Sequence, residues 1–103
     1  MPGISALYNR PEDVPRLAGL LRMFAAARHI PKHQIAESAA ISPAYVTLVL
    51  DGRRTPSLRV LTALAGALGG VTPELLLAAS RPSPPPEVCA AFLWALLLPA
   101  TPV

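Results

Sequence analysis

Five prolines constrain the fold of this chain more than any other feature of its sequence. Each of them precedes or opens an apolar-periodic stretch, and they are Pro15, Pro31, Pro43, Pro56 and Pro73. Proline is tolerated in the first turn of an α-helix and disrupts the interior of one. Because the prolines are 12 to 17 residues apart, they predict five helices of about two to four turns, joined by short loops.

Apolar side chains recur at helical spacing behind each proline, which predicts the bounds of the helices and their inward faces. The expected helices are Val14–Arg28, Lys32–Ala39, Pro43–Leu50, one from Pro56 or Ser57 to Leu68, and one that starts at Pro73. Ser42 and Thr72 are expected N-caps, and Gly69-Gly70 is expected to end the fourth helix. The expected inward residues are Leu17, Leu20, Leu21, Phe24, Ile35, Ala36, Ala39, Val46, Val49, Leu58, Leu61, Leu64, Ala65, Leu68, Leu75, Leu76 and Ala79. No stretch alternates convincingly at period two, so an all-α fold is predicted.

The composition changes towards both ends of the chain. Residues 1–14 show no clear period and are expected to form a loose arm before the helical domain, residues 15–80. Residues 81–86, RPSPPP, predict a semi-rigid linker. Residues 87–103 contain a last helix, expected at Glu87–Leu98, that is apolar almost all round. Such a helix cannot stand alone in water and needs a partner surface.

Residues 32–51 show the pattern of two short helices that cross steeply. The small side chain of Ala36 would let the second helix approach the first, and Ala40 stands at the turn, where a positive φ favours glycine. Val46 and Val49 would lock the second helix against the first. This pattern is the sequence signature of a helix-turn-helix.

On these residues the chain resembles the Cro/phage-repressor class of helix-turn-helix proteins, the XRE family. The resemblance runs without a gap over residues 21–76, and its most specific parts are IAESAAIS, DGRRTPSL and LAGALGGVTPELL. It implies a five-helix domain that binds operator DNA as a dimer.

The resemblance also implies which side chains contact DNA. The residues expected to enter or flank the major groove are Pro43, Ala44, Tyr45, Thr47 and Leu48, and those expected to contact phosphates are Lys32, Arg53, Arg54 and Arg59. The charge distribution agrees with DNA binding by this part of the chain. Residues 1–80 carry eight basic and five acidic side chains and so account for the whole net charge of +3. Two alternatives stay open: a merely solvated Arg53-Arg54 loop, and Tyr45 as a surface packing residue.

Several positions depart from the family pattern. Ala25 and Leu50 stand where members often have a paired arginine and glutamate, Ala40 replaces the usual glycine, and Asp51 replaces a common asparagine. Both members of the charged pair are absent together, and apolar contact in place of such a pair is neutral or stabilising in many proteins. No predicted groove residue is Arg, Lys, Asn or Gln, the side chains that make bidentate base contacts. We therefore expect modest direct readout of bases, with DNA shape contributing more.

The C-terminal helix is expected to form a homodimer. The reason is that the proline linker would hold the helix away from its own core. The residues expected to form the dimer contact are Phe92, Leu93, Trp94, Leu96 and Leu97. Docking on its own domain is the alternative. The apolar run from Val88 to Leu98 has 11 residues, whereas a membrane span needs about 20, and no membrane partner is expected.

Other classes of site are not indicated. Cys89 is the only cysteine, so a reduced, cytoplasmic setting is expected. His29 and His33 do not make a metal set, no cofactor motif is present, and no enzyme is expected. The sequence therefore predicts a dimeric DNA-binding repressor. The alternative is an interaction module of the same fold, which would use its apolar third helix and tail to bind a toxin or a polymerase subunit.

Overall fold

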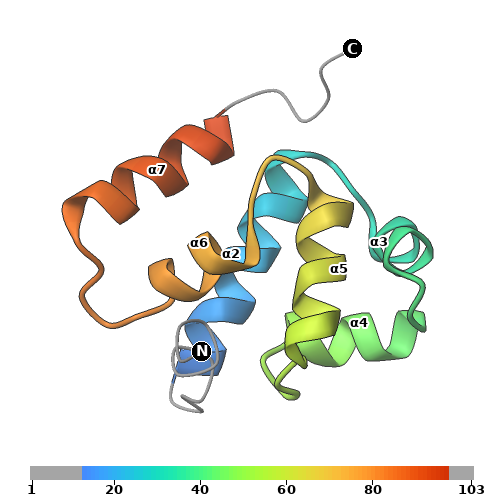
Figure 1. Cartoon of the computed structure of the whole chain (residues 1–103). Coiled ribbons are helices and arrows are strands. Elements are labelled where there is room, and N and C mark those ends of the chain that lie inside the picture. The colour runs from blue at the N-terminus through green and yellow to red at the C-terminus, as the bar shows by residue number, and fades with distance from the viewer. Residues whose placement is uncertain (1–12, 98–103) are drawn as a thin grey trace.

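The computed structural model describes residues 13–97, and within this range it contains six α-helices and no strand (Figure 1). The helices are α2 (Val14–Ala27), α3 (Lys32–Ala39), α4 (Pro43–Leu50), α5 (Leu58–Leu68), α6 (Pro73–Ala79) and α7 (Pro86–Leu97). The predicted all-α class is confirmed over these residues, and each helix begins within two residues of its predicted start. Of the predicted arm, residues 1–14, only Asp13 and Val14 are among the described residues. Leu98, the predicted end of the last helix, also lies outside them.

Hydroxyl caps explain where three of the helices begin. Ser42, Ser57 and Thr72 each accept a hydrogen bond from the backbone N–H three residues later, at 3.1, 3.2 and 3.1 Å. The predicted caps Ser42 and Thr72 are thereby confirmed, and a proline follows each of them as the first helical residue. A cap of this kind stabilises a helix by about 1 kcal/mol.

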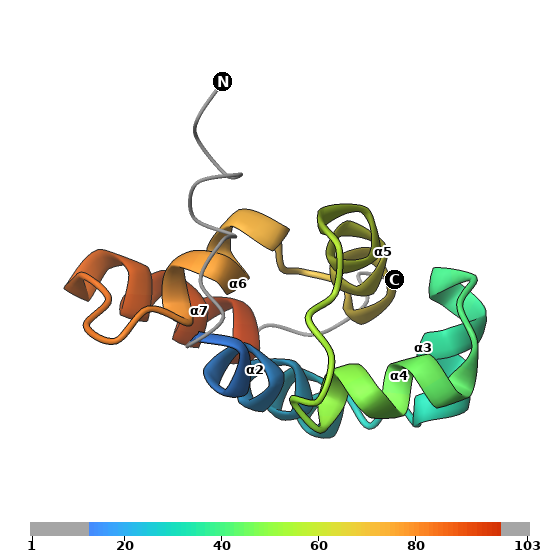
Figure 2. The ribbon, with the colours of Figure 1, turned by 90° about the horizontal axis from the view of Figure 1, so that it is seen from below.

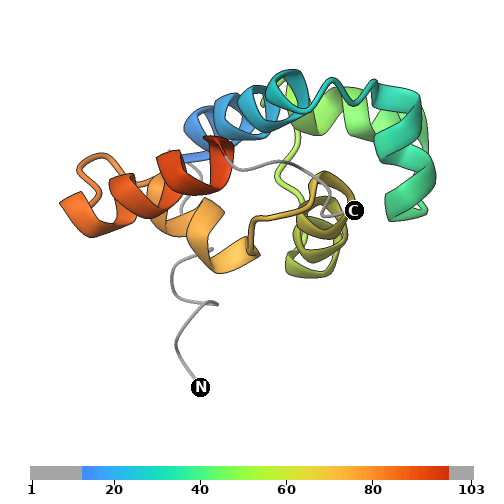
Figure 3. The same cartoon turned by 90° about the horizontal axis from the view of Figure 1, so that it is seen from above.

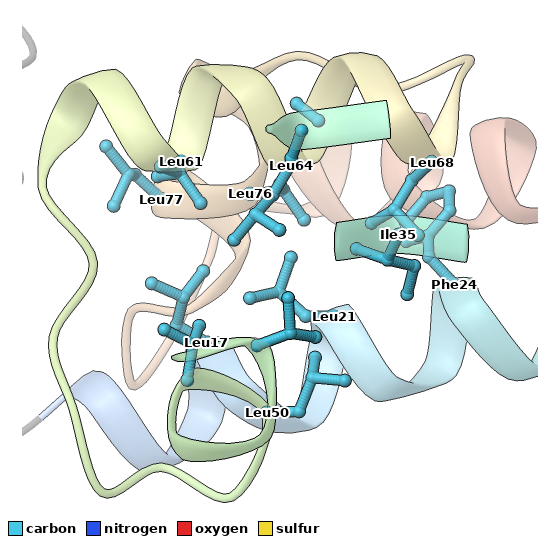
Figure 4. Close-up of a cluster of buried hydrophobic side chains, with 14 of the residues drawn as sticks. Leu17, Leu21, Phe24, Ile35, Leu50, Leu61, Leu64, Leu68, Leu76 and Leu77 are labelled. Atoms are coloured by element: carbon cyan, nitrogen blue, oxygen red, sulfur yellow. The ribbon is translucent and has the colours of Figure 1, made fainter. Parts of the chain in front are cut away.

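One apolar core joins all six helices, and Figure 4 shows side chains of α2 meeting those of α5 and α6 in it. Most of the predicted inward residues are buried, but Leu20, Leu58, Leu75 and Ala79 are only half-buried. Leu77, which was not predicted, is buried. The reason is that α6 packs against α2, α5 and α7 at once, so three neighbours decide which of its sides is covered.

The last helix, α7, packs against α2 and α6 of its own chain (Figure 1). Phe92 and Ala95 are each 6 % exposed, and the rings of Phe92 and Phe24 meet edge to face with centroids 5.2 Å apart. Nη2 of Arg28 donates a hydrogen bond of 2.8 Å to the carbonyl oxygen of Ala95. The expectation that the proline linker holds this helix away from its core is therefore wrong. The chain reverses after α6, because α2 and α6 present apolar surface that α7 covers.

Candidate nucleic-acid interface

A tight turn at Ala40 joins α3 to α4 and sets the angle between them. Ala40 has a φ of +59°, the left-handed conformation expected at this position. The backbone N–H of Ala40 donates to the carbonyl of Glu37, and that of Ile41 donates to Ala36, at 3.3 and 3.0 Å. These bonds close the end of α3 as a Schellman motif. Ala36 is buried where α3 and α4 pack together, so this part of the predicted helix-turn-helix is confirmed.

The helix α4 lies at the surface beside α3 (Figure 2). Its inner side holds Val46, Val49 and Leu50, which are all at most 5 % exposed. At 100° per residue, Ala44 and Leu48 lie on the side opposite to these three. The predicted groove residues are all on the surface, Pro43 and Ala44 exposed and Tyr45, Thr47 and Leu48 half-buried.

The loop after α4 presents two exposed arginines next to this helix. Gly52 has a φ of +75°, and the N–H groups of Gly52 and Arg53 donate to the carbonyls of Val49 and Leu48, at 3.1 and 2.9 Å. This second Schellman motif turns the backbone sharply at the end of α4. The guanidinium carbon of Arg54 lies 5.5 Å from the centroid of the Tyr45 ring, within the range of a cation–π contact. Tyr45 therefore holds Arg54 beside the first turn of α4.

Lys32 lies on another side of α4. It is exposed at the first position of α3 and lines a shallow groove with Leu50 and Arg22. Tyr45 and Leu50 are about 140° apart around the axis of α4, so Lys32 and Arg54 flank the helix on different sides. The N-cap of α3, Pro31, has no side-chain acceptor to offer, which leaves the first N–H groups of α3 for solvent or an anion. Arg59, the second residue of α5, is exposed as well.

Two carboxylates accompany these cations. Glu37 is exposed on α3 and lines a small hollow with Pro43, and Asp51 is exposed at the end of α4. The four predicted phosphate contacts outnumber them, so the surface around α4 carries a net positive charge.

Arg22 contributes to the geometry of α4, and sequence reasoning missed it. Its Nη1 donates to the carbonyl oxygen of Leu50, one of the last carbonyls of α4 that the helix itself leaves unpaired. Leu50 is buried and Ala25 is half-buried where the family pattern has a charged pair. The signal that could have revealed Arg22 is its position three residues before Ala25, on the side of α2 that faces α4.

The five residues predicted for dimerisation are divided between two sides of α7. Phe92 belongs to the core of its own chain, which corrects its assignment, and Leu96 is half-buried. Leu93, Trp94 and Leu97 are exposed to 54, 67 and 80 %, and they share the outer side of the helix. This outer face, Leu93–Trp94–Leu97, belongs to α7, and in Figure 3 α7 (orange to red) and α4 (green) lie on different sides of α2 (blue).

The described residues contain no metal centre, since no group of three or more His, Cys, Asp or Glu side chains could hold an ion there. His29 and His33 are both exposed. Of the helices between residues 13 and 97, none alone is long and apolar enough to cross a bilayer, and α5 and α6 reach that length only together, across a bend of 102°.

A model of the family described as a helix-turn-helix domain matches residues 16–79. The match covers all but the first two residues of α2 and the whole of α3 to α6, including the turn at Ala40, and ends before α7. Comparison with curated proteins and with solved structures gives no match.

Proposed function

The chain belongs to the helix-turn-helix domain family, and from this we propose that it is a sequence-specific transcriptional regulator that inserts α4 into the major groove of DNA. One observation carries the proposal: the outer side of α4 is at the surface, with Lys32 on one side of it and Arg54 on another. A recognition helix needs this combination, because phosphate contacts position a protein on the duplex while the helix reads the base edges.

The proposal gives each surface residue a role. Pro43, Ala44, Thr47 and Leu48 face the base edges, and Tyr45 positions Arg54 for a phosphate. Lys32, Arg53 and Arg59 contact further phosphates. The uncapped start of α3 adds N–H donors to the Lys32 contact. No catalytic residue is assigned.

We further propose that the protein is a cytoplasmic homodimer of the Cro/repressor type, which represses transcription by covering a promoter. The outer face, Leu93–Trp94–Leu97, supports this, since apolar side chains so exposed favour contact with another apolar surface. The helices α7 and α4 lie on different sides of α2, so pairing through the outer face would leave both recognition helices free. A symmetric dimer would bind two half-sites separated by one helical turn of DNA or a multiple of it.

Selection from random duplexes, followed by titration across a salt series, tests DNA binding. The affinity is expected to fall steeply with salt because Lys and Arg displace counterions from the phosphates. Replacing Arg53 and Arg54 by alanine is expected to lower the slope of log K against log salt by about 2 and to weaken all sequences alike. The double lysine variant R53K/R54K is the matched control and should keep most of the slope.

A flat salt response in the unmodified protein, with no enriched sequence, would contradict the proposal. The same holds if the alanine variant binds as tightly as the lysine variant.

The outer face also favours a second candidate, a module of the same fold that binds a protein such as a toxin or a polymerase subunit. Under this hypothesis the arginine-to-alanine variant should keep its partner. A polar substitution at Leu97 should release the partner instead, and pull-down with both variants separates the two functions.

A further inference from the structure

The surface of α4 lacks the side chains that usually read bases. The eight residues of this helix, PAYVTLVL, include no charged residue and no amide. Hydroxyl groups occur only on Tyr45, whose ring holds Arg54, and on Thr47. The N-cap Ser42 has its Oγ engaged as the acceptor for the Tyr45 N–H. A bidentate contact with guanine or adenine therefore cannot come from this helix.

What α4 does offer is a row of methyl groups. Ala44 and Leu48 are four residues apart on the outer side, so their side chains are neighbours. Thr47 is three residues after Ala44, so it neighbours Ala44 on the other side and adds a methyl group and a hydroxyl group. Pro43, exposed at the start of the helix, extends the same apolar surface. Together the three methyl-bearing side chains and the Pro43 ring form one apolar surface, which we call the methyl face, Pro43–Ala44–Thr47–Leu48.

Thymine is the base that this face matches. Of the four bases, only thymine presents a methyl group in the major groove, at C5. Its O4 accepts a hydrogen bond that a threonine hydroxyl can donate. Guanine, cytosine and adenine have no methyl group there and present polar groups, which an apolar surface placed on them would leave unpaired at a cost in binding energy.

Resting on the proposed function, we infer that α4 reads its site through thymine methyl groups, and that the preferred DNA carries thymines where Ala44, Thr47 and Leu48 approach the groove. Specificity then comes from desolvating methyl groups rather than from paired hydrogen bonds.

Replacement of single thymines by deoxyuridine tests the inference with the full chain and the selected duplex. Uracil keeps every hydrogen-bonding group of thymine and removes only the methyl group. Each contacted methyl group is expected to contribute about fourfold to Kd, the value of one buried methylene. Deoxyuridine in the flanking DNA, outside the selected site, is the matched control and should leave Kd unchanged.

Two protein variants connect the effect to named side chains. Thr47→Ser removes one methyl group and keeps the hydroxyl, and Ala44→Gly removes the other small methyl group. In each variant the loss on uracil substitution should disappear at one thymine and persist at the others. Thermal unfolding of both variants verifies that the fold is retained.

Two outcomes would overturn the inference while leaving DNA binding intact. One is a selected site dominated by G·C pairs, as expected if Asp51, or Gln34 and His33 of α3, read the bases. The other is a Kd that no uracil substitution changes. Both differ from failure of the proposed function, in which the unmodified thymine duplex shows no salt-dependent, arginine-dependent binding.

Discussion

Tyr45 illustrates how a residue can serve DNA binding without entering the groove. The guanidinium of Arg54 lies over its ring, and this contact keeps the guanidinium beside α4. Exposed cation–π contacts contribute about 0.5–1 kcal/mol. We expect Tyr45→Leu to raise the Kd for DNA about two- to fivefold by releasing Arg54, and Tyr45→Phe to leave it unchanged, in a fluorescence titration. If Tyr45→Phe weakens binding as much as Tyr45→Leu, the hydroxyl contacts the DNA and the positioning role is wrong.

Ala40 carries a conformational cost at the turn of the helix-turn-helix. The left-handed backbone brings its Cβ close to the following carbonyl oxygen. Ala40→Gly is therefore expected to raise the free energy of unfolding by about 1 kcal/mol in urea denaturation. Gly52→Ala is the reverse control. Gly52 also has a positive φ, +75°, and a Cβ there would fit, since its nearest neighbour, Cβ of Ala18, would lie 3.5 Å away. This substitution should therefore lower the free energy of unfolding by a similar amount, through backbone strain alone. A less stable Ala40→Gly protein would show that the turn does not carry this strain.

Arg28 adds a hydrogen bond to the apolar contact between α7 and α2. Its guanidinium lies 4.6 Å from the centroid of the Phe24 ring and donates to the carbonyl of Ala95, while its Nε and Nη1 have no hydrogen-bond partner among the described residues. Burial lowers the pKa of the Arg28 guanidinium from its ordinary value. Gly70 accommodates this side chain, because a Cβ there would lie 2.9 Å from Nη2 of Arg28. Arg28 thus connects α2, the loop before α6 and α7.

At the scale of the elements, α7 completes the core of the domain, although the family match ends before this helix. Its inner side supplies Phe92 and Ala95 to the core. We expect Phe92→Ala to lower the free energy of unfolding by about 3 kcal/mol, through lost burial and a cavity beside Phe24. Leu97→Ala, measured in a monomeric sample, is the control and should change stability by less than about 0.5 kcal/mol because Leu97 is 80 % exposed. Equal effects of the two substitutions in urea denaturation would contradict the packing of α7.

At the scale of the whole molecule, two functions are assigned to two separate parts of the fold. The methyl face and its cations belong to α4 and its neighbours, and the outer face belongs to α7, on the other side of α2 (Figure 3). Changes in one part are therefore expected to leave the function of the other intact.

Leu97→Glu tests this separation. We expect the variant to sediment as a monomer, because a carboxylate on the outer face opposes burial there, and to bind a single half-site with unchanged affinity. Trp94 reports the same event, since its emission should shift to the red when the dimer dissociates. Ser83→Glu, an exposed linker position with the same change of charge, is the control and should remain a dimer. An unmodified protein that is monomeric at micromolar concentration would contradict the dimer proposal.

Local chemistry allowed much of this molecule to be predicted from the sequence alone. Prolines, hydroxyl caps and apolar spacing act within a few residues, so α3 and α4 were predicted with their observed bounds, and the left-handed turn at Ala40 followed from the position of a small residue between them. The side of α4 that faces outward was also determined by its own periodicity.

Only the tertiary structure decided the contacts that join distant segments. The sequence could not show that α7 returns to cover Phe24, or that Leu77 is on a buried side of α6. Nor could it show that Arg22 and Arg28 donate to carbonyls 28 and 67 residues away. The physical reason is that a helix apolar on several sides can bury any of them. Which side it buries depends on the surfaces that the rest of the chain leaves uncovered.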